Sequence, residues 1–151
     1  MDRRELLSAG LGALAGAITV REVGTLHAAG QTQATTQSKP LGAHPLGDAF
    51  QGWQGTMIEV TYPPGVVSAA HQHPGPTFGY VVSGKIRWAI NGEPAKTLEA
   101  GQSFFEPMGS VHSTSANASD TEPARISVVI LSKPGEPLSK PAKSGDPEFI
   151  R

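Results

Sequence analysis

HQHPGPTFGY, the stretch from His71 to Tyr80, decides how this chain of 151 residues is interpreted. His71 and His73 stand two residues apart, and residues two apart on a strand point to the same face of a sheet. Neutral imidazole is the usual protein ligand for Fe, Zn, Cu or Ni. Taken alone, such a pair is more often two ordinary polar histidines than a metal site, so the prediction depends on a third ligand.

A second stretch, GQSFFEPMGSVH, supplies that ligand at its last residue, His112. Its pattern is typical of a strand, a turn at Pro107–Gly109 and a return strand. The chain has 5 histidines, and the other two lie nearer the N-terminus, outside the strand-rich region. The third histidine therefore makes a metal site of His71, His73 and His112 more favoured than the pair alone does.

The residues around these histidines alternate in the manner of short strands. The chain has 18 Gly and 13 Pro, which is well above the average content and favours strands joined by turns. Asn91-Gly92 between two such runs is a strong hairpin signal. After the N-terminal segment no helical periodicity is present, so the pattern predicts an all-β sandwich or barrel. The expected strands are Gln54–Tyr62, Phe78–Val82, Lys85–Ile90, Thr97–Leu98, Ser103–Glu106 and Ile126–Leu131.

Composition excludes several classes of function. The formal net charge is -1 and the pI is about 6.5, which gives no basic surface for a nucleic-acid partner. The chain has no cysteine, so disulfides, a thiol nucleophile and thiolate metal ligands are excluded. Any transition metal must therefore be held by nitrogen and oxygen atoms.

The histidines and turn glycines resemble the two motifs of the cupin superfamily, G-x5-H-x-H-x3-4-E-x6-G and G-x5-P-x-G-x2-H-x3-N. The resemblance covers about residues 54–131. It implies an all-β cupin fold, a double-stranded β-helix or jelly-roll barrel in a single domain. The residues in register are Gly65, His71, His73 and Gly84 for the first motif, and Gly101, Pro107, Gly109 and His112 for the second.

Thr77 stands where the first motif has a glutamate, which is a metal ligand in many cupins. The metal site could be degenerate and empty, or Thr77 could be a weak neutral ligand or hold a metal-bound water. The third interpretation is a three-histidine site that resembles those of the thiol dioxygenases and β-diketone-cleaving dioxygenases in the superfamily. We favour the last two together, with Thr77 next to the three ligands. In the second motif Ala116 occupies the asparagine position, and Asn117 follows one residue late.

Glu106 precedes the turn at Pro107. An exposed carboxylate at a strand end is the simpler interpretation of this residue, and the alternative is that it orients a histidine or acts as an acid or base near the metal. Five aromatic residues could line a substrate cavity, although most aromatics in a small barrel belong to the core. They are Phe78, Tyr80, Trp88, Phe104 and Phe105.

The resemblance implies a homodimer that binds one divalent metal ion per subunit. Fe(II) is the first choice, with Mn(II), Ni(II) and Zn(II) as alternatives. Three neutral histidines would leave the full charge of the metal to attract an anionic ligand. The predicted function is therefore a metal-binding cupin, such as a non-haem dioxygenase that acts on a small organic anion. Two alternatives stay open, a non-catalytic periplasmic module that binds metal or a small ligand, and a metal-dependent lyase.

The ends of the chain predict export and flexible segments. Arg3 and Arg4 before an apolar stretch resemble a twin-arginine (Tat) signal peptide over residues 1–29, and this stretch is too short for a stable membrane span. A periplasmic or secreted product is expected. Residues 30–49 are predicted to be a flexible linker, residues 50–132 the cupin domain, and residues 133–151 an extended Pro/Lys-rich tail.

Overall fold

The structure is a computed structural model that describes residues 34–143 and 145. The predicted signal peptide, residues 1–29, lies outside this part of the chain. The described residues form β-strands and one short 3-10 helix, η1 (Asp48–Phe50). The strands are β1 (Gln37–Pro45), β2 (Gln54–Tyr62), β3 (Val67–Ser68), β4 (His71–Gln72), β5 (Thr77–Ser83), β6 (Lys85–Ile90), β7 (Lys96–Glu99), β8 (Ser103–Glu106), β9 (Val111–Asn117), β10 (Ala124–Ser132) and β11 (Lys140–Pro141).

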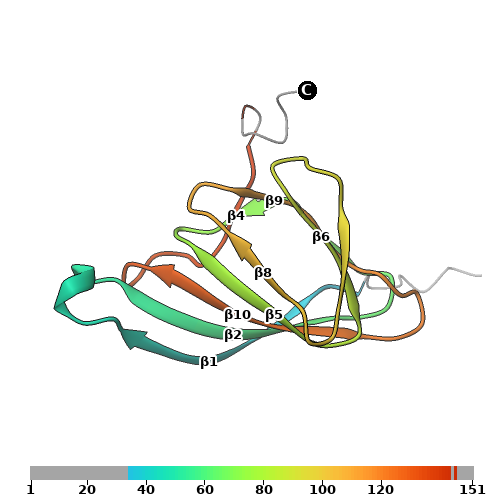
Figure 1. Cartoon of the computed structure of the whole chain (residues 1–151), viewed down its shortest axis with the longest axis horizontal. Helices are drawn as coiled ribbons and strands as arrows, with labels where there is room; N and C mark the ends of the chain where they lie inside the picture. The colour runs from blue at the N-terminus through green and yellow to red at the C-terminus, as the bar shows by residue number, and fades with distance from the viewer. Residues whose placement is uncertain (1–33, 144, 146–151) are drawn as a thin grey trace, which may run out of the picture. The chain divides into compact units, whose positions relative to one another are not determined.

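The strands form two antiparallel sheets, so the all-β prediction is confirmed (Figure 1). Sheet A has the order β1-β2-β10-β5-β8. Sheet B has the order β11-β4-β9-β6-β7, with β3 also paired to β9. Neighbours in each sheet are mostly distant in sequence, as in the jelly-roll arrangement that the sequence predicts.

All six predicted strands are present, and three of them are longer than predicted by one or two residues at each end. The predicted hairpin joins β6 to β7, and Asn91 and Gly92 have φ angles of 51° and 70°. These positive angles suit the right-handed twist of a tight hairpin. The four motif glycines also have positive φ, which explains why glycine occupies these turns. Their angles are 69° for Gly65, 72° for Gly84, 92° for Gly101 and 82° for Gly109.

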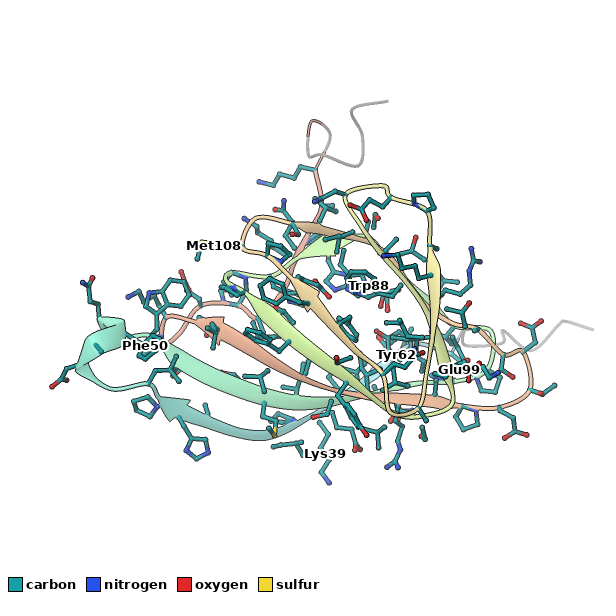
Figure 2. The ribbon with its side chains drawn as sticks, in the orientation of Figure 1. Lys39, Phe50, Tyr62, Trp88, Glu99 and Met108 are labelled. Atoms are coloured by element: carbon teal, nitrogen blue, oxygen red, sulfur yellow. The ribbon has the colours of Figure 1, made fainter. Side chains whose placement is uncertain are left out.

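The core lies between the sheets and follows the two-residue period of the strands. Along β10 the residues Ala124, Ile126, Val128 and Ile130 face inward and are buried. Trp88 and Tyr62 meet them inside the fold, whereas Lys39 points away from β1 (Figure 2). Of the five aromatic residues considered for a cavity, two belong to this core, Trp88 and Phe104. The other three are exposed, and they are Phe78, Tyr80 and Phe105.

The structure differs from the predicted linker and tail. Gln37–Pro45 within the predicted linker forms β1, which pairs along β2 at the edge of sheet A, so a flexible linker is wrong for these residues. The two prolines of β1 are tolerated there because an edge strand has a free side. In the predicted tail, Lys140–Pro141 pairs with β4 at the edge of sheet B. Hydrogen bonding to distant strands orders both segments, and local composition did not indicate it.

Among the described residues there is no helix with the length and apolar content that would cross a membrane.

Candidate metal centre

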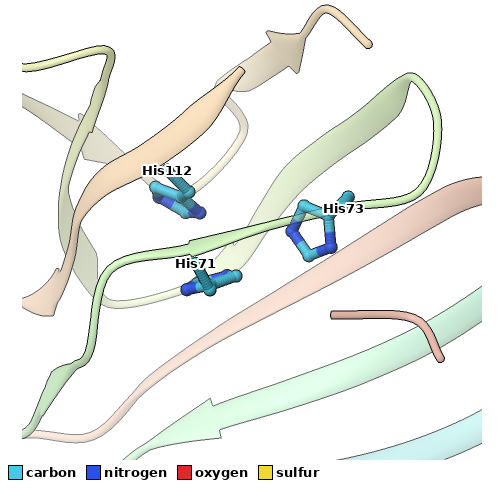
Figure 3. Close-up of side chains that lie close together, drawn as sticks. All are labelled: His71, His73 and His112. Carbon is cyan, nitrogen blue, oxygen red and sulfur yellow. The ribbon is translucent and has the colours of Figure 1, made fainter. Parts of the chain in front are cut away.

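The three predicted histidines meet on two neighbouring strands of sheet B. His71 on β4 pairs in register with His112 on β9, and His73 follows β4 directly. One ligand atom from each histidine lies within 4.8 Å of those of the other two. The rings are gathered in one place (Figure 3), and the ring centroid of His71 lies 5.0 Å from that of His73 and 5.0 Å from that of His112.

Backbone carbonyls fix the tautomers of the two first-motif histidines. The Nδ1 of His71 lies 2.8 Å from the carbonyl oxygen of Ala69, and the Nδ1 of His73 lies 2.7 Å from that of Leu138. A carbonyl can only accept, so each Nδ1 carries the proton and donates it. Each Nε2 therefore keeps a free lone pair, which is the usual arrangement of metal-binding histidines.

His112 is more deeply buried, with 3% of its surface exposed. Burial, together with the nearby His71 and His73, lowers its pKa to about 3, so the ring is neutral at ordinary pH. Its Nε2 is buried and has no hydrogen-bond partner among the described residues. An unpaired buried nitrogen is costly unless a ligand satisfies it. A neutral imidazole with an unpaired nitrogen beside two others fits a divalent metal ion.

Glu106 lies within the same cluster and is 3% exposed. The interpretation as an exposed strand-end carboxylate is wrong, because Glu106 follows Phe104 on the inward face of β8. Its Oε1 lies 3.2 Å from Nδ1 of His112, and its Oε2 lies 3.7 Å from Nε2 of His73. Burial raises the pKa of Glu106 to about 7, although a hydrogen bond from Trp88 opposes the rise.

Thr77 is fully buried at the start of β5, and its hydroxyl donates to the carbonyl of Gly75 at 3.4 Å. Thr77 on β5 pairs directly with Glu106 on the neighbouring strand β8. Directly opposed residues of two antiparallel strands have Cβ atoms about 5 Å apart on one face of the sheet. The carboxylate that the first motif lacks at position 77 is thus present on the neighbouring strand.

A cavity of about 480 Å³ lies against His71 and His73. Its wall includes Ile58, Val60 and Tyr62, alternate residues of β2 that face inward. A second cavity, of about 340 Å³, is lined by residues that include Phe50, Trp53 and Met108, and none of the predicted site residues lies in its wall. The larger cavity is therefore the one through which a ligand would reach the histidines.

Two contributors to the site were missed from the sequence. Tyr62 lines the cavity and its hydroxyl shares a hydrogen bond of 2.6 Å with Oγ of Ser115. Its position two residues after Val60 on a predicted strand could have indicated an inward side chain. Leu138 acts through a backbone carbonyl, and no residue type reveals such a role.

Comparison with known proteins supports a cupin domain. Residues 58–130 match the profile of the Cupin domain family. No curated protein sequence is significantly similar to the chain. A protein with a double-stranded β-helix domain from Klebsiella pneumoniae superposes with a TM-score of 0.56 at 21% identity, covering 75% of this chain and 89% of that one.

Similar structures with a stated activity include a DMSP lyase and an oxalate oxidase. The DMSP lyase DddQ from Ruegeria pomeroyi has a TM-score of 0.50 at 23% identity, over 58% of this chain and 43% of that one. An oxalate oxidase in complex with glycolate has a TM-score of 0.50 at 22% identity, over 65% of this chain and 51% of that one. Identities this low establish the shared fold and no more.

Proposed function

We propose that the protein is a metal-binding cupin whose ligands are His71, His73 and His112, on the premise that residues 58–130 match the Cupin domain family. The single observation that carries the proposal is the convergence of three histidine nitrogens within 4.8 Å of one another. The fixed tautomers of two rings and the unpaired Nε2 of the third support it. Fe(II) is the preferred metal, with Mn(II), Ni(II) and Zn(II) as alternatives.

A bound divalent metal would supply Lewis acidity and positions for an anionic ligand. The chain's own residues hold the three histidine rings, bury Glu106 next to two of these rings and leave the cavity open to a small molecule. We propose oxygenation of a small organic anion as the reaction. The fold similarity to an oxalate oxidase supports redox chemistry on this scaffold only as an analogy.

Metal-dependent lyase chemistry is the second candidate, and Glu106 favours it. Its carboxylate lies 3.2 Å from Nδ1 of His112 and 3.7 Å from Nε2 of His73, so it is placed to exchange a proton with a substrate held at the histidines. A similar structure is that of a DMSP lyase, which again is an analogy of fold. A non-catalytic module that binds metal or a small ligand in the periplasm remains the candidate from a different class.

Metal content of the purified protein tests the proposal. We expect close to one equivalent of a divalent metal per chain by elemental analysis, and loss of that metal in His71→Ala. His44→Ala is the matched control, because His44 is exposed on β1 far along the chain from the cluster. Protein that neither contains metal nor takes it up on reconstitution would overturn the proposal.

Oxygen uptake separates the enzyme candidates. The iron-loaded protein should consume oxygen in the presence of a chelating anion, tested with a β-diketone, a thiol-containing amino acid and oxalate. Product formation without oxygen uptake would favour the lyase. Metal-loaded protein that binds such anions and leaves them unchanged would favour the binding module.

We also propose that the chain is exported by the twin-arginine route. The support is the pair Arg3-Arg4 ahead of an apolar stretch. Cell fractionation should find the protein in the periplasm, and replacing both arginines with lysine should retain it in the cytoplasm. Equal export of the two proteins would contradict this route.

A homodimer is proposed from the outer face of sheet A. Met57, Val129, Phe78 and Phe105 form an apolar row, because each is the register partner of the next across four strands. Three of them are exposed by 42%, 53% and 45%, namely Met57, Phe78 and Phe105. An uncharged apolar patch of this kind fits a second copy of itself.

Light scattering after gel filtration tests the dimer. Phe78→Ser with Phe105→Ser should yield a monomer, whereas Phe50→Ser on η1, equally exposed at 53%, should leave the mass unchanged. A wild-type protein that is already monomeric at micromolar concentration would contradict the dimer.

A further inference from the structure

The cavity beside the candidate metal centre indicates the class of ligand, and this inference rests on the proposed function. The cavity lies between the edge strand β1 of sheet A and the edge formed by β4 and β11 of sheet B. Its volume of about 480 Å³ is within the usual range for small-molecule sites. His71 and His73 are part of its wall, so a ligand in the cavity can reach the metal position.

The inner part of the cavity is apolar. Ile58 and Val60 from β2, Ile130 from β10 and Leu138 from the C-terminal segment provide aliphatic surface. Hydroxyl-bearing residues also contribute to the wall. Thr36, which precedes β1, is half-buried, and Ser38 on β1 is exposed. The phenol of Tyr62 already shares its hydrogen bond with Ser115. A ligand body of hydrocarbon would therefore match most of the surface that it meets.

Charge in the cavity would be confined to the end at the histidines. Among the described residues that line the cavity there is no Asp, Glu, Lys or Arg, and its histidines are the proposed metal ligands. The metal would be the one strong positive centre in reach of a ligand. A single anionic head group at the metal is thus stabilised, whereas a second charge deeper in the cavity would be desolvated without a partner.

We infer that the natural ligand is a monoanion with a metal-binding head group and an apolar body. The head group binds at the three-histidine centre and the body lies along Ile58, Val60 and Ile130. Dianions and phosphorylated compounds are disfavoured, because the cavity wall offers no cation for their second charge.

Alkyl hydroxamates provide the test, since they join a monoanionic bidentate oxygen head group to a chain of chosen length. Binding to the cobalt-loaded full chain is measured by titration of the visible absorption of the metal. From acetohydroxamate to hexanohydroxamate, we expect affinity to rise by up to about fourfold per methylene. Adipic monohydroxamate replaces the terminal methyl of hexanohydroxamate with a carboxylate, and it should bind at least about tenfold more weakly.

A matched pair of variants on β2 tests whether the cavity wall causes the dependence of affinity on chain length. Ile58→Ser should flatten the dependence on chain length while acetohydroxamate binding stays the same. Thr61→Ser, on the opposite face of the same strand and outside the cavity wall, should retain the wild-type dependence. Two outcomes would overturn the inference and leave the proposed function standing. In the first, the protein holds the metal but affinity does not depend on chain length. In the second, the two six-carbon compounds bind equally well. Failure to load cobalt at all would overturn both the inference and the proposed function.

Discussion

The two motif segments place their polar site residues in unlike surroundings. His71 and His73 in the first segment line the cavity, and backbone carbonyls hold their Nδ1 atoms. His112 and Glu106 in the second segment are each 3% exposed and lie 3.2 Å apart. The first segment thus presents lone pairs toward an incoming ligand, whereas the second forms a buried polar pair in the interior.

This difference changes what the missing glutamate means. Within the first motif, Thr77 stands at the position where the motif has a carboxylate. Read across the sheet, Glu106 occupies the facing position on the next strand and lies beside His73 and His112. The site as a whole therefore keeps an acidic group, contributed by the second segment.

The largest expected effect is a difference in stability between a variant of the second segment and a variant of the first. His112→Ala leaves Glu106 buried without its imidazole partner, so the free energy of unfolding of the metal-free protein should fall by about 1–3 kcal/mol. His71→Ala removes a partly exposed ring and should change it by less than about 1 kcal/mol. Urea unfolding monitored by tryptophan fluorescence measures both. Equal losses in the two variants would contradict the contrast, although both should lose metal.

Exchanging the two facing residues tests the position of the carboxylate. Glu106→Gln should weaken metal binding about 10–100-fold, as removal of a group that supports the ligands typically does. The double variant Thr77→Glu with Glu106→Thr should recover most of that loss, because the two positions face the same region across the ladder.

Isothermal titration with Zn(II) measures the affinities of these variants. Glu99→Gln is the control, since this carboxylate is 59% exposed and pairs with Lys85 on the surface. A double variant no better than Glu106→Gln alone would mean that the acidic group works only from β8.

Shortening the C-terminus tests the support of the first segment. A chain that ends after Pro137 loses the Leu138 carbonyl that fixes His73 and the pairing of β11 with β4. We expect metal affinity to fall about tenfold. A chain that ends after Lys143 keeps both features and should bind as the full chain does. Equal affinities for the two shortened chains would show that His73 needs no such support.

The smallest effect is expected at Thr77 itself. Thr77→Val removes the hydroxyl that donates to Gly75 and keeps the shape of the side chain. The stability should fall by about 1 kcal/mol, and metal affinity should change by less than about threefold. A loss of affinity above tenfold would instead assign the Thr77 hydroxyl to the metal or to its bound water.

Much of the fold was predictable because its signals are local. Strands such as Gln54–Tyr62 alternate in polarity, and the dipeptide Asn91-Gly92 sets the hairpin that follows Lys85–Ile90. The short strand Val67–Ser68 and the edge strand Gln37–Pro45 were missed. Both are defined by pairing with distant strands, and their own residues carry little pattern.

One irregularity in β9 also explains a departure from the second motif. The pairing with β6 passes from Ala89–Thr114 to Ile90–His112, so Ser113 is an extra residue in β9. A bulge of this kind shifts all later residues by one place. Asn117 is therefore the asparagine of the second motif, displaced by one residue along the chain. It is buried, and its side-chain amide donates to the carbonyls of Tyr62, Pro63 and Glu122.

The sequence alone determined which histidines come together, because motif spacing and turn glycines place His71 and His112 on paired strands and His73 directly after the first of these strands. It could not determine the surroundings of these histidines. Only the tertiary structure brought Glu106 opposite Thr77 and the carbonyl of Leu138 onto His73. Alternation and turns depend on neighbouring residues, whereas strand register and the burial of a carboxylate depend on packing between segments far apart in the chain.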